Sequence, residues 1–275
     1  MEKSHDKPFF LACGFIKPHL PWYVPEKYFD MHPLESIELP NTLKNDLDDV
    51  PDFGKKLAIE VYDPSMEQNF AVKGGDHNNV LANNQWHKAV QGYLAAISFA
   101  DAQVGRLLDA LEKSEHAGNT VVVLWGDHGW HLGEKQHWRK HALWETTTRT
   151  TLIISAPGGI RKNRLCERPV SLIDLYPTLV ELCGLPERKG LDGQSILPLL
   201  KDPQKKWERP VVMTYGFRNH AVQTERWRYI QYNDGSEELY DHTRDPDEWT
   251  NLASQSKYER VIRKLRKSLP TVNRQ

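Results

Sequence analysis

Hydrophobic residues divide the first part of the chain into short uncharged runs and one long helical repeat. The runs Pro8–Phe15, Thr120–Trp125 and Thr150–Ala156 have the length of strands, and the second indicates a buried strand of a parallel sheet. Gln85–Lys113 carries apolar residues at steps of three and four, which predicts a helix that covers the sheet. A chain of 275 residues with this pattern is long enough for one large α/β domain with an appendage, or for two domains.

The later part of the chain changes to shorter elements. Val170–Cys183 predicts a helix, and a second short helix is expected to end near Leu200. Lys201–Arg209 is charged and has no apolar period, so we expect one α/β unit over residues 1–205 and a small α+β unit over residues 206–275. The elements predicted in the second unit are strands at Pro210–Tyr215, His220–Thr224, Arg226–Tyr232 and Glu238–Asp241, and a helix at Lys257–Ser268.

Tyr23–Asn84 is punctuated by prolines and predicts irregular structure, and a loop of that length usually covers a site. An acidic cluster lies near its middle, formed by Asp46, Asp48, Asp49 and Asp52. A calcium-binding loop is one interpretation, but the spacing lacks the glycine and the glutamate of an EF-hand. We therefore expect a solvated loop there.

Charge and composition exclude two classes of protein. Lysine plus arginine (36) nearly equals aspartate plus glutamate (37), so the chain is not a nucleic-acid binder that works through bulk charge. No stretch approaches the roughly 18 apolar residues of a membrane span, and the first residues lack the apolar core of a signal peptide. The compartment stays open, and an anionic ligand would have to be met by a local basic cluster.

The densest candidate chemistry follows the Thr120–Trp125 run. Asp127 and His128 come directly after it, with a glycine on either side that lets the backbone turn sharply and a ligand approach closely. Ligands of open α/β sheets bind at the carboxyl ends of strands, so an acid and an imidazole there, with basic residues behind them, could hold a metal and an anion together. The alternative is a turn with a helix N-cap, in which the basic residues form a solvated face.

The same stretch resembles the second metal-ligand motif of the type I sulfatases, in the alkaline phosphatase superfamily, and most of all their iduronate-2-sulfatase-like branch. The residues that match are Asp127, His128, Gly129, Leu132-Gly133, Lys140 and Trp144-Glu145. Upstream, Lys17-Pro18-His19-Leu20-Pro21 resembles the sulfatase segment whose histidine reaches the sulfate ester. The segments similar to the standard sulfatase ending are Glu238–Asp241, Asp245–Glu248 and Asn251-Leu252.

The resemblance implies an alkaline-phosphatase-like α/β sandwich with a mostly parallel central sheet, of which this chain holds the C-terminal part, followed by a small antiparallel sheet with one helix. It also implies one Ca²⁺ at Asp127 and His128, of which this chain holds half the site. Lys140 would bind a sulfate oxygen. His19 would donate a hydrogen bond to the ester oxygen or protonate the leaving group. The substrate would be a sulfated sugar or polysaccharide, and the residues expected beside it are Lys17, Trp130, Leu132 and Glu134. Members of the family are commonly exported or lysosomal.

The cysteines do not supply the nucleophile of this family. Cys13, Cys166 and Cys183 have no metal-type spacing, and their odd number leaves no full set of disulfides. Cys13 and Cys183 lie in apolar runs and are expected to be small core residues. None has the Cys-x-Pro-x-Arg context in which the family's cysteine becomes formylglycine, and the family's Asp-Asp pair is also missing.

We therefore expect the half of a sulfatase that lacks the nucleophile, as a fragment, a truncated gene product or one chain of a split protein. Such a chain should be inactive alone, should bind calcium weakly and should expose apolar surface where a missing N-terminal half would pack. One alternative is a phosphodiesterase or phosphatase of the same superfamily. Another is a non-catalytic binding or complementing subunit.

Overall fold

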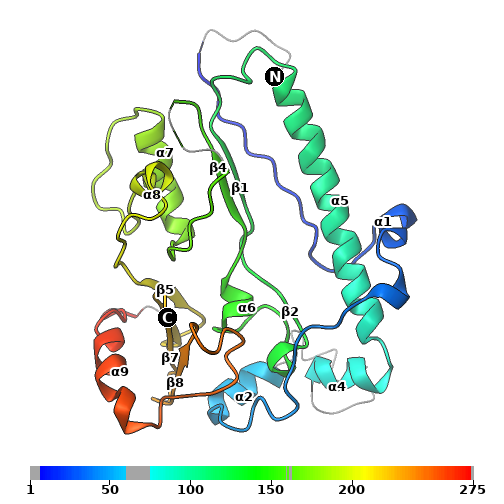
Figure 1. Ribbon diagram of the computed structural model, residues 1–275, viewed down its shortest axis with the longest axis vertical. Coiled ribbons are helices and arrows are strands. Elements are labelled where there is room, and N and C mark those ends of the chain that lie inside the picture. Colours follow the sequence, from blue (N-terminus) through cyan, green and yellow to red (C-terminus); the bar gives the residue numbers. More distant parts are fainter. Residues whose placement is uncertain (1–6, 60–74, 159, 161–162, 274–275) are drawn as a thin grey trace.

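The computed structural model describes residues 7–59, 75–158, 160 and 163–273. In Figure 1 a four-stranded sheet and helix α9 (Glu259–Arg266) lie in the lower part, and the long helix α5 (Trp86–Glu112) rises along one side of the upper part. The other α-helices are α1 (Glu26–Asp30), α2 (Asp52–Ile59), α4 (Gly75–Ala82), α6 (Glu145–Thr148), α7 (Leu175–Leu182) and α8 (Leu197–Lys201). The 3₁₀ turns are η1 (Leu34–Ser36), η2 (Glu134–Gln136), η3 (Leu172–Asp174) and η4 (Ser256–Tyr258). The strands are β1 (Val122–Trp125), β2 (His131–Leu132), β3 (Trp138–Arg139), β4 (Leu152–Ser155), β5 (Val211–Thr214), β6 (His220–Gln223), β7 (Trp227–Gln231) and β8 (Glu237–Asp241).

Helix α5 confirms the helix predicted at Gln85–Lys113. Its inner face is made of small residues such as Ala95, which is fully buried. Gly92 lets Trp22 pack directly against the helix, because a Cβ at this position would lie 2.8 Å from the Trp22 ring. The helix therefore anchors the N-terminal segment that carries His19.

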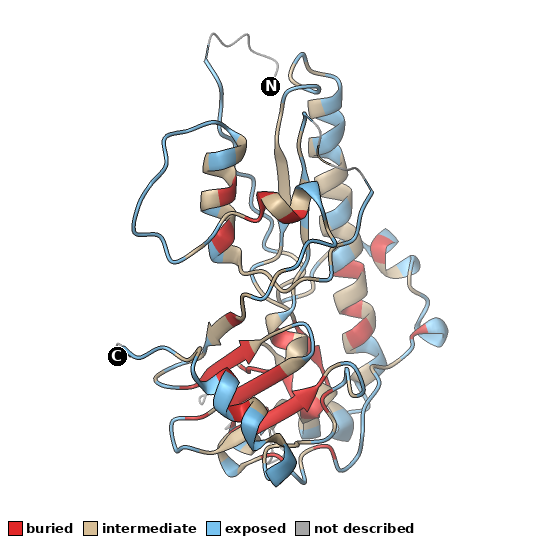
Figure 2. Cartoon of the chain, turned by 60° about the vertical axis from the view of Figure 1, so that its left-hand side comes forward, coloured by how far each residue is buried: buried red, intermediate tan, exposed pale blue. Residues whose placement is uncertain are grey.

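The C-terminal sheet runs in the order β5-β6-β7-β8, and every neighbouring pair is antiparallel. The four predicted strands and the helix after them are confirmed. Alternation along β7 sets the two faces of the sheet. Tyr229 lies opposite Val222 in the cluster that packs on α9, and Ile230 lies opposite Ala221 in the cluster on the other face. Figure 2 shows these strands buried beneath the exposed outer face of the helix.

Strand β1 forms a two-stranded ribbon with β4, and the pair is antiparallel. The strands predicted at Thr120–Trp125 and Thr150–Ala156 exist, and the mixed α/β class is as expected. The prediction that β1 is buried in a parallel sheet is wrong for the described residues, because its only strand partner there is β4 and Trp125 is 50% exposed. Pro8–Phe15 forms no strand, since no neighbouring strand pairs with it among the described residues.

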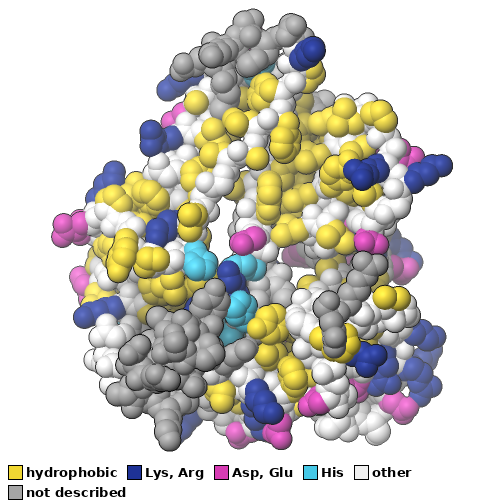
Figure 3. All heavy atoms as spheres, turned by 180° about the vertical axis from the view of Figure 1, so that it is seen from behind, with side chains coloured by type: hydrophobic (Ala, Val, Ile, Leu, Met, Phe, Trp, Pro, Cys, Tyr) yellow, Lys and Arg dark blue, Asp and Glu magenta, His cyan; other side chains and the backbone are white. Residues whose placement is uncertain are grey.

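Large hydrophobic side chains are exposed on this upper part of the molecule. Phe10 and Ile16 of the N-terminal segment are 86% and 83% exposed, and Ile153 of β4 is 56% exposed. Figure 3 shows hydrophobic side chains over much of the upper part of one face. The exposed apolar surface that the sequence predicts is therefore present.

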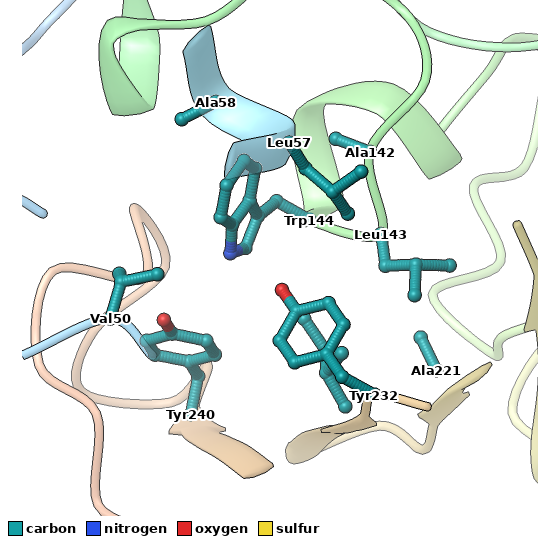
Figure 4. Close-up of a cluster of buried hydrophobic side chains, with 10 residues drawn as sticks. Val50, Leu57, Ala58, Ala142, Leu143, Trp144, Ala221, Tyr232 and Tyr240 are labelled. Atoms are coloured by element: carbon teal, nitrogen blue, oxygen red, sulfur yellow. The ribbon is translucent and has the colours of Figure 1, made fainter. Parts of the chain in front are cut away.

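A second core cluster joins the C-terminal sheet to the rest of the chain. Its buried side chains are Val50, Leu57, Ala58, Ala142, Leu143, Trp144, Ala221, Ile230, Tyr232 and Tyr240. Figure 4 shows Trp144 between α2 and the sheet residues Tyr232 and Tyr240. Both tyrosines and the Trp144 indole donate hydrogen bonds to the buried carboxylate of Glu238. The sheet thus packs directly on the segment that precedes α6.

Some local predictions are wrong and others are confirmed. Cys13 and Cys183 are exposed, because Cys13 lies in the unpaired N-terminal segment and Cys183 follows the last residue of α7. The described part of Tyr23–Asn84 contains α1, α2 and α4, and residues 60–74 lie outside the description. The helix predicted at Val170–Cys183 is confirmed as η3 and α7. Ser171 and Asp174 form a capping box at its start. Among the described helices, none is both long and apolar enough to cross a membrane.

A buried ion cluster around Glu248 ties the end of the sheet to the start of α6. The Glu248 carboxylate lies 2.7 Å from Arg228 Nε and 2.8 Å from His242 Nε2, and it accepts the Glu145 backbone N–H at 2.9 Å. Arg228, which is 1% exposed, also donates to the Leu143 carbonyl at 2.9 Å. Burial alone would raise the pKa of Glu248, but Arg228 and His242 lower it overall. The ionised carboxylate therefore stabilises this junction.

Replacing Glu248 with Gln should lower the free energy of unfolding by about 1.5–3 kcal/mol, because the shape is kept while the buried Arg228 loses one of its two carboxylate partners and keeps only Glu145. The lowered pKa means that this contribution is present above pH 4.5 and is lost as the pH falls through the folded value. Urea unfolding near neutral pH and in acid measures both effects, and the difference from wild type should narrow in acid. The control is Glu259→Gln in the exposed pair with Arg263, which should change the free energy by less than about 1 kcal/mol. Equal losses in the two variants would contradict the role of Glu248.

Candidate functional site

Close packing fixes the turn after β1. A Cβ on Gly126 would overlap Thr150 Oγ1, and a Cβ on Gly129 would overlap the Thr146 carbonyl oxygen. The Gly129 N–H also donates to the Thr147 carbonyl at 2.6 Å. Both glycines are therefore needed because the turn presses against α6 and the chain that follows it.

Asp127 and His128 lie on this turn and face each other. The Asp127 carboxylate is 84% exposed and its Oδ2 lies 3.4 Å from His128 Nε2. His128 Nδ1 lies 2.7 Å from the Gly129 carbonyl oxygen, so it donates there, and in a neutral ring Nε2 carries the lone pair. A carboxylate and an imidazole lone pair that converge fit part of a divalent-cation site. Across the described ranges, no group of three or more His, Cys, Asp or Glu side chains is arranged to hold a metal.

Trp130 brings His128 and His19 to one aromatic cluster. The Trp130 ring stacks on His128 at 6.2 Å and on Tyr93 of α5 at 5.9 Å, and His19 meets it edge-on at 5.5 Å. His19 Nδ1 lies 2.7 Å from the Leu20 carbonyl oxygen. Two histidines that are 109 positions apart in the sequence (128 − 19) thus both contact the ring of Trp130.

Other predicted site residues turn inward or back onto their own loop. The Lys17 ammonium donates to the Pro21 carbonyl of the same loop. Trp130 and Leu132 are only 8% and 9% exposed. Glu134 accepts the Leu132 N–H at 2.7 Å, and burial raises the pKa of its carboxyl. The contact of these four side chains with a substrate stays a prediction.

The basic residues of the β2–β3 hairpin divide into paired and unpaired charges. Lys135 forms a buried ion pair with Asp46 at 2.6 Å and also donates to the Glu248 carbonyl. Arg139 pairs with Asp76 of α4. The expectation that Asp46 is solvated is wrong, because the pair with Lys135 lies in the core. No carboxylate of the described residues pairs with the half-buried Lys140.

Two histidines of the hairpin are buried. His131 is fully buried, its Nδ1 lies 3.1 Å from the Glu134 carbonyl oxygen, and burial lowers its pKa well below 6.5. His137 lies edge-on to it at 4.9 Å, with its nitrogens facing the carbonyl oxygens of Ala58 and Lys140. The sequence signal was the density of histidines between positions 128 and 141, which does not show which of them are buried.

The backbone around Lys140 is strained. Arg139 and His141, on either side of it, have φ values of 70° and 73°, and Lys135 and Gln136 have φ values of 55° and 52°. Residues with a side chain rarely adopt this left-handed region, and such strain is kept where surrounding contacts hold it in place. The His141 ring stacks on Tyr215 at 5.5 Å, which connects this loop to the turn after β5. Figure 3 shows histidine, basic and acidic side chains gathered around an opening near the middle of the molecule.

Comparison with known proteins places this geometry in a family. The family model "Sulfatase" matches residues 1–185, and the model "N-sulphoglucosamine sulphohydrolase, C-terminal" matches residues 133–275. A Sulfatase of Formosa agariphila is 42% identical over 271 residues, which are 98% of this chain and 51% of that protein. The Iduronate 2-sulfatase of Mus musculus is 32% identical over 217 residues, which are 67% of this chain and 37% of that protein. The chain spans about half the length of the first of these relatives.

Solved structures share the fold. One structure, described as in complex with its substrate D-Glucosamine-2-N, 6-O-disulfate, has a TM-score of 0.67 at 20% identity and covers 91% of this chain and 62% of that chain. The Phosphonate Monoester Hydrolase of Agrobacterium radiobacter has a TM-score of 0.77 at 22% identity, covering 96% of this chain and 56% of that chain. The expected fold class, alkaline-phosphatase-like α/β, is confirmed.

The buried His131 predicts a pH-dependent stability. The unfolded chain takes up a proton near the ordinary pKa of 6.5 and the folded chain does not, so the free energy of unfolding should fall as the pH drops below 6.5. Urea unfolding measures this free energy at about pH 7.5 and about pH 5.5. The difference between the two pH values should be smaller for His131→Gln than for wild type. The exposed His87, changed to Gln, is the control and should keep the wild-type difference. A wild-type difference retained in His131→Gln would contradict the assignment.

Proposed function

The chain belongs to the sulfatase family, and from that membership we propose that it supplies the metal-binding and sulfate-binding part of an enzyme that hydrolyses sulfate esters. The observation that carries the proposal is the uneven pairing of the hairpin cations. Lys135 and Arg139 are neutralised by Asp46 and Asp76, and Lys140 has no carboxylate partner among the described residues. A fixed cation without a countercharge stabilises the negative charge of a sulfuryl group.

Asp127 and His128 are proposed to hold one Ca²⁺. Calcium prefers oxygen ligands, which suits the Asp127 carboxylate, and imidazole is a less usual ligand for it. The site has only these two converging ligands among the described residues, so further oxygen ligands would have to come from elsewhere. When bound, the ion would supply charge neutralisation beside the sulfuryl oxygens.

His19 is proposed to donate a hydrogen bond or a proton to the oxygen of the leaving alcohol. Its Nδ1–H donates to the Leu20 carbonyl, and this bond suits both the neutral and the protonated ring. Nε2 is therefore the nitrogen left to meet the ester oxygen, and it can do so without the ring turning. The edge contact with Trp130 holds the ring in that orientation.

The nucleophile is proposed to come from outside these 275 residues, since none of the three cysteines has the Cys-x-Pro-x-Arg context. The exposed apolar side chains of β1 and β4 support this, because Trp125 and Ile153 offer a surface on which a complementing segment could pack. The second candidate is a non-catalytic binding or complementing subunit, and a subunit that only binds predicts no turnover even when an N-terminal half is added.

The proposed substrate is a sulfated sugar. The Iduronate 2-sulfatase relative and the structural neighbour with a glucosamine disulfate support this class. Lys17, Trp130, Leu132 and Glu134 would shape the sugar side through the packing described above. A phosphate or phosphonate ester is the other candidate, supported only by the fold shared with the phosphonate monoester hydrolase.

The isolated chain should not hydrolyse a sulfate ester, and adding a polypeptide that contains the N-terminal half of a close relative, with its formylglycine, should give calcium-dependent turnover. An aryl sulfate and the matching aryl phosphate measure the reaction and its preference. The control is the same mixture with the relative's nucleophile changed to Ala. Turnover by the isolated chain would contradict the missing-nucleophile proposal, and preferred phosphate turnover would favour the second substrate class.

Calcium and sulfate should bind together. Calorimetry on this chain should show weak calcium binding that inorganic sulfate tightens, and Asp127→Ala should lose it because half of the protein ligands disappear. Lys140→Gln should remove the effect of sulfate and leave calcium binding in place, since an amide carries no charge. Asp109→Ala on the exposed side of α5 is the matched control. Calcium binding retained in Asp127→Ala would exclude the proposed ligand.

A further inference from the structure

The imidazole of His137 connects the loop of the candidate anion site to the core. The ring is 2% exposed, its Nε2 lies 2.6 Å from the Lys140 carbonyl oxygen, and its Nδ1 lies 3.0 Å from the Ala58 carbonyl oxygen near the end of α2. Edge contacts with His131 at 4.9 Å and Trp144 at 6.2 Å fix the plane of the ring. Ala58 and Trp144 belong to the core cluster drawn in Figure 4.

We propose that His137 is a positioning residue for Lys140, and that its Nε2–H holds the Lys140 carbonyl and so sets where the ammonium of Lys140 meets the anion. This inference rests on the proposed function, in which Lys140 binds a sulfuryl oxygen. His137 itself lies in the core and does not touch the anion.

The strained backbone explains why such a bond is needed. Lys140 lies between two residues with left-handed φ values, Arg139 and His141, and a relaxed backbone would turn its side chain elsewhere. The Arg139 pair with Asp76 and the His141 stack on Tyr215 restrain the flanking residues. Only the bond from His137 acts on the main chain of Lys140 itself among the side-chain contacts of the described residues.

The two contacts of the ring differ in what they require. A neutral imidazole donates from one nitrogen, and the shorter contact assigns that proton to Nε2. Donation to both carbonyls requires the protonated ring. Asp76, Arg139 and His131 are the titratable or charged groups that face it, and burial, which is the largest influence, lowers the pKa of His137 while the two carbonyls raise it. The bond to Lys140 is therefore kept in the neutral ring, and the bond to Ala58 is added on protonation.

Two amide substitutions separate these contacts. In His137→Gln the amide nitrogen takes the place of Nε2 and keeps a donor for Lys140, and in His137→Asn it takes the place of Nδ1 and keeps a donor for Ala58 only. Both variants are neutral and polar, so a merely structural role predicts similar effects. Calorimetric titration of the full chain with inorganic sulfate in the presence of calcium should show Gln within about twofold of wild type and Asn weaker by about threefold to tenfold, the effect of one lost hydrogen bond. Urea unfolding of both variants confirms that the folded state is compared.

A spectroscopic measurement tests the bond without sulfate. In chain labelled with ¹⁵N-histidine, long-range ¹H–¹⁵N correlation at neutral pH should show His137 protonated at Nε2. A proton on Nδ1 alone overturns the proposal, and so does an Asn variant that binds sulfate as tightly as the Gln variant. A wild-type chain that binds no sulfate contradicts the proposed function of Lys140. The ¹⁵N spectrum then tests the hydrogen bond from His137 to the Lys140 carbonyl independently of sulfate.

Discussion

Two buried charge pairs, Lys135 with Asp46 and Glu248 with Arg228, are linked by the bond from Lys135 to the Glu248 carbonyl, and they are the constraint on which the other features depend. Lys135 reaches from the hairpin to Asp46 and to the Glu248 carbonyl, and the carboxylate of Glu248 meets Arg228 of the sheet. Buried pairs of this kind add little net stability compared with apolar packing, but they are strongly selective for one arrangement because a wrong partner leaves a charge in the core. These contacts therefore join the hairpin, the Asp46 loop and the sheet into one unit.

This arrangement gives the site its electrostatics in a chain whose net charge is only −1. The hairpin could have presented several cations to solvent, but carboxylates neutralise Lys135 and Arg139, and Lys140 keeps its charge without a carboxylate partner among the described residues. Local selection of this kind suits a small anion better than a broad basic surface does, because a single oriented ammonium discriminates by position as well as by sign. The neighbouring Asp127 and His128 then add ligands for a cation on the adjacent turn.

The sequence predicted elements that local periodicity determines, and it failed where the partner is distant. Helix α5 and the strands of the C-terminal sheet were found because one face of each is apolar at the right period. The Asp46–Lys135 pair joins residues 89 positions apart, and no local pattern encodes it. An apolar run also indicates that a segment can be a strand, but it does not determine which strand pairs with it or in which direction. The apolar run of β1 therefore predicted a buried parallel sheet, and its antiparallel pairing with β4 could not be foreseen. Motif spacing located Asp127, His128 and His19, and only the fold showed that Trp130 brings the two histidines together.

The β1–β4 ribbon has a consequence for the time-dependent behaviour of the site. A two-stranded ribbon is only marginally stable, and the outer edges of β1 and β4 have no strand partners among the described residues. The amides of β1 should therefore exchange with solvent through local opening that leaves the C-terminal sheet closed. The cation ligands follow β1 and Lys140 follows the anchored hairpin, so the two halves of the site belong to regions of different local stability. A ligand that touches both halves would equalise their exchange rates, and its binding free energy would include the work of ordering the ribbon.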